Sequence, residues 1–177
     1  MKRIFHALLI ISFFVAADLL AQEPLKPRPS PLEMVTMKYE DTYVKITYCR
    51  PSKKGREIFG GLEPYGEVWR TGANEATEIT ITGDIKIAGE PLGAGTYSIF
   101  SIPEEKEWTI IINADLGQWG AFRYNTDHDV LRVKAKTEMT EQVYEPFTIE
   151  FEQKGIQKTN LLLIWDRTKV IIPLEFI

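Results

Sequence analysis

Charged side chains that could bind an anion gather in the stretch from Arg50 to Ala76. An arginine guanidinium is a planar fork that binds a carboxylate, sulfate or phosphate at two points, and neighbouring glycines let backbone N–H groups approach the same anion. Acidic residues in the stretch allow a second interpretation, in which the arginines pair with carboxylates or backbone carbonyls and hold a long loop in shape. We favour this second interpretation. The basic residues are Arg50, Lys53, Lys54, Arg56 and Arg70, and the acidic residues are Glu57, Glu63, Glu67 and Glu75.

Three further side chains of this stretch could contribute to a site. Trp69 is better explained as a core residue beneath the loop than as a surface on which a ligand stacks. Asn74 suits a turn, where asparagine satisfies backbone groups. Glu75 could act as a general base, although glycoside hydrolysis needs a second carboxyl group. We include all three among the candidate ligand-binding residues, together with Arg50, Arg56 and Arg70.

A second polar and aromatic stretch follows at residues 114–129. Its Trp119 and Tyr124 could form a platform on which a sugar stacks, or could cap one end of the fold. His128 lies between two aspartates, but adjacent residues seldom all point at one ion, and the only other histidine is His6. Trp119, Tyr124 and His128 therefore join the candidate ligand-binding residues, and we expect no metal and no cofactor.

The N-terminus has the pattern of a secretory signal peptide. Basic Lys2 and Arg3 precede an apolar run that is too short for a membrane span, and Ala21 offers a cleavage point. We expect an exported protein, periplasmic or extracellular, with no membrane span after cleavage. It would not be a lipoprotein, because the only cysteine is Cys49, far from the cut. Cys49 has no disulfide partner, so we interpret it as a small buried or edge residue.

The predicted domain organisation is a signal peptide at 1–21, a proline-rich linker at 22–31 and a single domain at 32–177. Residues 1–21 hold two basic and one acidic residue, so their loss changes the formal net charge from −4 to −5. A nucleic-acid partner would require a broad basic face, which this charge balance argues against. The remaining chain is long enough for one domain with a sizeable core.

Alternating apolar and polar residues predict β-strands along most of the chain. At 43–49, for example, apolar residues at every second position alternate with Lys45 and Thr47. Such runs number roughly nine or ten, and none has a helical period. We predict an all-β, single-domain antiparallel β-sandwich or jelly roll with two long loops, at 50–76 and 114–129.

Particular segments give more specific expectations. The strand predicted at 108–113 carries apolar residues on both faces and should therefore be central in a sheet. We also expect a glycine-rich corner at 91–95, separate strands at 130–136 and 147–152, and separate strands at 160–165 and 170–176 joined by a turn at 166–168.

Two segments carry a family resemblance that covers about residues 29–176. They read YCRPSKKGREIFGGLEPYGEVWRTGANEAT, from Tyr48, and AGTYSIFSIP, from Ala94. In combination they resemble the DUF2911 family of secreted bacterial proteins of unknown function. The resemblance implies an extracytoplasmic, β-rich domain common in Bacteroidetes-type bacteria, and it implies no reaction. It also implies serine where this chain has Cys49.

The function we favour from the sequence is non-catalytic binding of a small anionic or sugar-like ligand, or of a partner, through the two long loops. One alternative is a hydrolase that uses Glu75 with Arg70 and Asn74, and with His128 as a further candidate. Another alternative is a structural envelope protein. Convergence of the candidate side chains in one accessible cleft would favour binding or catalysis, whereas internal pairing would favour the structural role.

Overall fold

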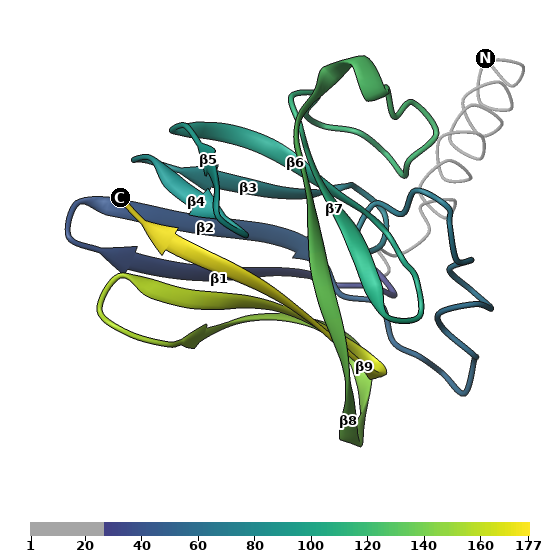
Figure 1. Cartoon of the computed structure of the whole chain (residues 1–177). Helices are drawn as coiled ribbons and strands as arrows, with labels where there is room; N and C mark the ends of the chain where they lie inside the picture. Colours follow the sequence, from purple (N-terminus) through teal and green to yellow (C-terminus); the bar gives the residue numbers. More distant parts are fainter. Residues whose placement is uncertain (1–26) are drawn as a thin grey trace, which may run out of the picture.

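Nine antiparallel strands form one hydrogen-bonded sheet in the computed structural model, which describes residues 27–177 (Figure 1). The predicted signal peptide lies outside these residues. The sheet order is β1-β2-β3-β6-β7-β8-β9-β4-β5, and a short 3-10 helix, η2, spans Thr126–His128. The strands are β1 (Leu32–Tyr39), β2 (Thr42–Cys49), β3 (Thr77–Ile81), β4 (Ile85–Ile87), β5 (Glu90–Leu92), β6 (Gly95–Ile102), β7 (Glu107–Asn113), β8 (Asp129–Gln153) and β9 (Lys158–Phe176).

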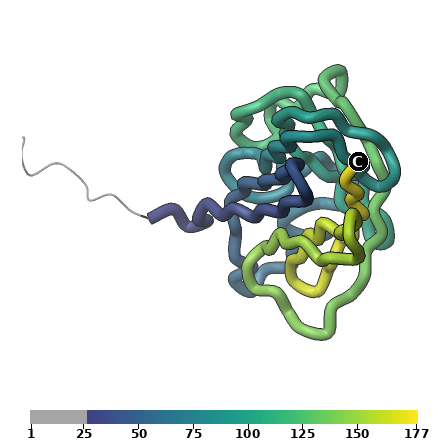
Figure 2. The backbone as a smooth tube through the Cα atoms, turned by 90° about the vertical axis from the view of Figure 1, so that its left-hand side faces the viewer, coloured from purple at the N-terminus to yellow at the C-terminus, as the bar shows by residue number. Residues whose placement is uncertain are grey.

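The sheet folds over on itself because its two longest strands change partners along their length. The first part of β8 pairs with β7, and its last part pairs with the start of β9. The end of β9 then pairs with β4. In the side view of Figure 2 the chain curls round, with the β8–β9 segment, green to yellow, opposite the teal strands. The predicted all-β, sandwich-like fold is confirmed.

The main core contains a cluster of aromatic rings beneath the first long loop, residues 50–76. Trp69 is 3 % exposed, and its ring lies 6.0 Å from the ring of Trp165 and 5.1 Å from that of Phe147. Its indole N–H donates to the carbonyl of Gly72 at 3.1 Å, so the buried polar atom is satisfied. Trp69 is therefore a core residue that anchors the loop, and it has almost no surface to offer a ligand.

A smaller core lies on the other face of β6 and β7. Phe100 and Ile111 are fully buried there with Ala76, and the ring of Tyr124 packs 5.0 Å from that of Phe100. The second long loop, residues 114–128, supplies Tyr124 and so covers this face. Since β7 lies between β6 and β8 and is buried on both faces, its predicted central position is confirmed.

One predicted corner contains a short strand, and two predicted breaks between strands were wrong. Pro91 belongs to β5, an edge strand, where a missing N–H leaves no ladder bond unmade. Strand β8 continues through 129–153 because its register shifts on both sides of Tyr144, and Pro146 falls within that irregular part. Strand β9 continues through the predicted turn, where only Asp166 adopts a positive φ of 54°.

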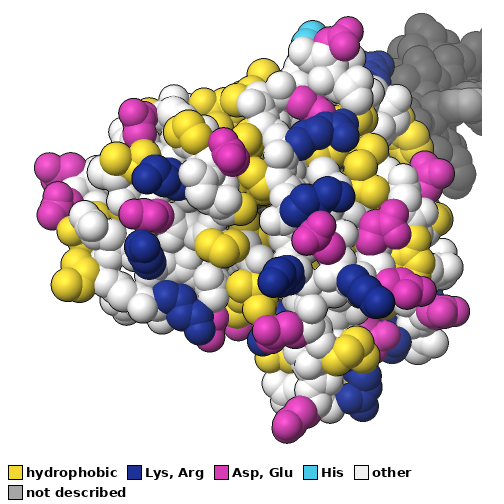
Figure 3. Space-filling view, in the orientation of Figure 1, with side chains coloured by type: hydrophobic (Ala, Val, Ile, Leu, Met, Phe, Trp, Pro, Cys, Tyr) yellow, Lys and Arg dark blue, Asp and Glu magenta, His cyan; other side chains and the backbone are white. Residues whose placement is uncertain are grey.

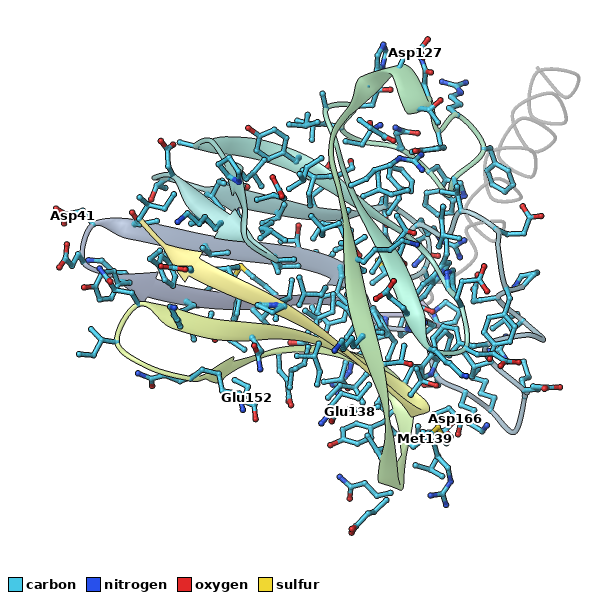
Figure 4. All side chains as sticks on the ribbon, in the orientation of Figure 1. Asp41, Asp127, Glu138, Met139, Glu152 and Asp166 are labelled. Atoms are coloured by element: carbon cyan, nitrogen blue, oxygen red, sulfur yellow. The ribbon has the colours of Figure 1, made fainter. Side chains whose placement is uncertain are left out.

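Both predicted long loops are present, and they lie at the same end of the molecule. In Figure 1 they are at the right and upper right, whereas the hairpin turn between β1 and β2 is at the left. Figure 4 labels Asp127 on the second long loop and Asp41 in that distant hairpin turn. Acidic and basic side chains are interspersed over the face drawn in Figure 3, with apolar groups between them.

Candidate functional site

An antiparallel bridge between Glu75 and Trp119 joins the two long loops. The N–H of Ala76 donates to the carbonyl of Gln118 at 2.8 Å beside this bridge. Residues directly opposite each other in such a pair present their side chains on the same face, with Cβ atoms roughly 4.5–5.5 Å apart. Consistent with this alternation, Glu75 and Trp119 lie at the surface, while Ala76 and Gln118 are buried.

Two residues with positive φ hold the bridge in place. Asn74 has φ 58° and Gly120 has φ 71°, values that asparagine and glycine adopt more readily than other residues. The N–H of Gly120 donates to the carbonyl of Asn74 at 2.9 Å, and the Asn74 amide donates to the carbonyl of Ser30 at 3.3 Å. Asn74 is thus engaged with backbone groups, as its sequence context predicted.

Glu75 is the central polar group of the first pocket, which has a volume of about 440 Å³. The Cys49 thiol donates to Glu75 Oε2 at 3.3 Å, and Arg28 Nη1 lies 2.9 Å from both carboxylate oxygens. The ion pair is largely exposed, and pairs of this kind contribute only about 0–1 kcal/mol, so a ligand could replace it readily. The pocket is lined by Arg28, Leu32, Thr47, Tyr48, Cys49, Glu75, Ala76, Glu78 and Gly117.

The carboxyl group of Glu75 is held in its ionised form. A hydrogen bond from its own backbone N–H lowers its pKa most, and the contacts with Cys49 and Arg28 lower it further. A general acid or base works best with a pKa near the working pH. The Glu75 carboxylate is therefore better suited to accept hydrogen bonds than to transfer protons near neutrality.

The second pocket adjoins the first at Gly117 and has a volume of about 570 Å³. Three of its apolar side chains are unusually exposed: Leu116 at 49 %, Trp119 at 61 % and Phe122 at 87 %. Exposed apolar groups that gather in one place often mark an interaction site. The pocket is lined by Asp115, Leu116, Gly117, Gln118, Trp119, Phe122 and Arg123.

The polar side chains of the second pocket differ in whether they have a hydrogen-bond partner within the protein. Asp115 Oδ2 lies 2.8 Å from His128 Nδ1, and this hydrogen bond, with the aspartate charge, raises the pKa of His128. Arg123 is exposed and makes no ion pair or side-chain hydrogen bond with any residue in 27–177. The Gln118 side chain is 9 % exposed, and neither its oxygen nor its nitrogen has a hydrogen-bond partner among the described residues.

Tyr124 is engaged within the protein. Its hydroxyl donates to Asp129 Oδ2 at 2.7 Å and accepts a hydrogen bond from Arg132 at 2.5 Å. Burial, and then the hydrogen bond to Asp129, raises the pKa of Tyr124 to about 12. Of the two roles considered for Tyr124, the structure supports the cap over Phe100.

The arginines of the first long loop do not converge on an anion site. Arg50 donates to the carbonyl of Phe147 at 3.1 Å and to the hydroxyl of Thr148 at 2.9 Å, which ties the loop to β8. Arg56 donates to backbone carbonyls of its own loop, at Ser52 and Lys53. For these two arginines the favoured interpretation, internal pairing that shapes the loop, is confirmed.

For Arg70, the internal pairing that we favoured from the sequence is not present among the described residues. Its Nε is buried without a hydrogen-bond partner, and within 27–177 it forms no ion pair. Its charge acts on Glu63, a half-buried carboxyl of the same loop. Trp69 is buried and Arg70 is half-buried, with its charge acting on a carboxyl of its own loop.

Of the candidate residues, the structure brings together Asn74, Glu75 and Trp119, with His128 joined to them through Asp115. It separates from them Arg50, Arg56, Trp69, Arg70 and Tyr124. Trp69 is buried, Arg50, Arg56 and Tyr124 are hydrogen-bonded within the fold, and Arg70 is half-buried without a partner. The side chains that sequence reasoning missed are Arg28, Phe122 and Arg123.

No group of three or more His, Cys, Asp or Glu side chains among residues 27–177 lies close enough to hold a metal ion. No helix of the described chain is long and apolar enough to cross a membrane.

Comparison with known proteins gives one match. The profile of the family described as "Protein of unknown function (DUF2911)" matches residues 30–174. Neither the curated proteins nor the solved structures compared with the chain contain a match.

Proposed function

The chain belongs to the DUF2911 family, whose function is unknown, and we propose that it is a non-catalytic protein that binds a carbohydrate at the junction of its two long loops. The observation that carries this proposal is the bridge between Glu75 and Trp119, which sets an exposed indole ring beside an ionised carboxylate. An aromatic face and a hydrogen-bond acceptor side by side match the two kinds of surface that a sugar ring presents.

The chemistry of a sugar fits both adjoining pockets. The axial C–H groups of a sugar ring form an apolar face, which can pack on the negative face of an indole or phenyl ring. The hydroxyls at the ring edge need acceptors and donors, and the first pocket offers these through Glu75, Glu78 and Arg28. Pocket volumes of about 440 and 570 Å³ lie in the range that small ligands occupy.

Binding is favoured over hydrolysis by the state of Glu75. Glycoside hydrolysis uses a protonated carboxylic acid beside a second carboxylate. The lowered pKa of Glu75 opposes the first role. Arg70, the partner considered for Glu75, acts on Glu63 instead.

Export to the periplasm or the medium forms part of the same proposal. It rests on the basic start, the apolar run and Ala21 in the sequence. Protein recovered from the cell envelope should begin near Gln22 by intact-mass measurement. Envelope protein that retains Met1 would contradict export by signal cleavage.

A glycan array probed with the protein and two variants tests the proposed function. Trp119→Ala should lower the signal on every bound glycan by about tenfold or more, the scale of losing a central aromatic contact. The matched control is Ile156→Ala, which removes an 84 % exposed apolar side chain from the distant hairpin between β8 and β9. Absence of any binding by the parent protein, or equal binding by Trp119→Ala, would contradict the proposal.

A further inference from the structure

We infer that the bound carbohydrate is acidic, and that Arg123 binds its carboxylate or sulfate group in the second pocket. This inference rests on the proposed function and specifies its ligand class. It starts from the side chain of Arg123, which is exposed, lines the second pocket and follows the 87 % exposed Phe122 in the chain.

Arg123 differs from most arginines of the described chain in having no partner for its guanidinium; Arg70 also has none, but its Nε is buried within the first long loop. Arg28 pairs with Glu75, and Arg132 with Asp129. Arg50 donates to backbone and hydroxyl oxygens of β8. Arg123 has no such partner within residues 27–177, so its five N–H donors remain available for a carboxylate or a sulfate, which fit the guanidinium fork at two points.

The charges around Arg123 favour an anion. Asp115 is the only acidic residue that lines the second pocket, and its carboxylate is hydrogen-bonded to His128 at 2.8 Å. The Asp115 carboxylate is thus engaged with His128, and it forms no ion pair with Arg123, whose charge has no partner within residues 27–177. An acidic group entering here therefore meets an unpaired positive charge.

The first pocket has an excess of negative charge, whereas the second has an unpaired positive charge, and this difference orients the ligand. It contains two carboxylates, those of Glu75 and Glu78, and the single cation of Arg28, which is already paired with Glu75. Repulsion disfavours an acidic group in the first pocket, whereas neutral hydroxyls can donate to its carboxylates. The acidic substituent should therefore lie in the second pocket, with the sugar ring against Trp119 or Phe122 and its hydroxyls toward Glu75.

An array in which each acidic glycan is printed beside a neutral glycan of the same backbone tests this assignment. One set carries uronic acids beside their methyl esters, and the other carries sulfate esters beside their unsulfated forms. The parent protein should give signals about tenfold higher on acidic members of at least one set, and the excess should fall as salt is raised. Arg123→Gln should remove that excess.

A control isolates the position of the charge. Lys136→Gln removes the same charge from an exposed site on β8, outside both pockets, and should keep the excess. Equal signals on acidic and neutral glycans, or an excess that survives in Arg123→Gln, would overturn the assignment while leaving carbohydrate binding intact. If the parent protein gave no signal on any glycan, both proposals would be overturned.

Discussion

Glu75 and Trp119 lie opposite each other in the one bridge that connects the two long loops of the described chain. Their position depends on how each of the two long loops is anchored to the rest of the fold. The first long loop is held by the core residue Trp69 and by the clasp of Arg50 on β8, and the second packs Tyr124 over Phe100. A rigid support of this kind orders the paired side chains before a ligand arrives, which reduces the entropy lost on binding.

Arg50→Lys should lower the free energy of unfolding. Lysine cannot reproduce the two directed hydrogen bonds to Phe147 and Thr148, and an unsatisfied half-buried acceptor costs about 1–3 kcal/mol. The control is Arg123→Lys, which should change stability by no more than about 0.5 kcal/mol because Arg123 is exposed. Chemical denaturation measures both values, and equal effects would refute the clasp.

Gln118→Met should stabilise the protein. The buried amide has no hydrogen-bond partner among the described residues, and methionine fills a similar volume without a polar group. Removing the desolvation penalty should add about 1 kcal/mol to the free energy of unfolding. A destabilised variant would indicate that the amide is satisfied in solution.

Glu63 should make stability fall as pH rises. Burial raises its pKa from 4.5 to about 7, against the smaller opposing effects of Arg70 and Arg56. A carboxyl whose pKa is higher in the folded state stabilises the fold when protonated, so the contribution is complete below about pH 4.5 and is lost by about pH 7. Because Glu63 is only partly buried, the loss should be about 1–2 kcal/mol.

The comparison of the parent with Glu63→Gln isolates that effect from other titrating groups. Denaturation at a pH below and a pH above this window should give a smaller stability difference in Glu63→Gln than in the parent. The exposed Glu57→Gln serves as the control and should retain the parent difference. If Glu63→Gln showed the same pH dependence of stability as the parent protein, the shifted pKa of Glu63 would be contradicted.

The fold was largely predictable because period-two alternation records which face of a strand is buried. The run from Trp108 to Ile112 indicated a strand buried on both faces, and β7 is central. The continuity of β8 was not predictable, since bulges around Tyr144 accommodate Pro146 only through pairing with β9, a partner distant in the chain. Local signals favoured a break there.

The site was predictable only in part, because residues that are close in the sequence do not converge in the structure. Arg50, Arg56 and Arg70 share one loop with Glu75, yet that loop wraps a tryptophan-rich core and turns them in different directions. Arg28 reaches Glu75 from the proline-rich N-terminal segment, a contact that only tertiary structure creates. Phe122 and Arg123 lay in the predicted second loop, but alternation says nothing about exposure in irregular backbone.

The most direct test of carbohydrate binding is the indole N–H signal of Trp119 in an NMR titration with the oligosaccharide that binds most strongly on the array. The protein has four tryptophans, and Trp119 is 61 % exposed whereas Trp69, Trp108 and Trp165 are at most 3 % exposed. Trp119→Phe identifies its signal by removal. Carbohydrate binding at Trp119 predicts that this signal moves with added ligand until saturation while the signals of the three buried tryptophans stay in place. A bound oligosaccharide that leaves the Trp119 signal unmoved would contradict it.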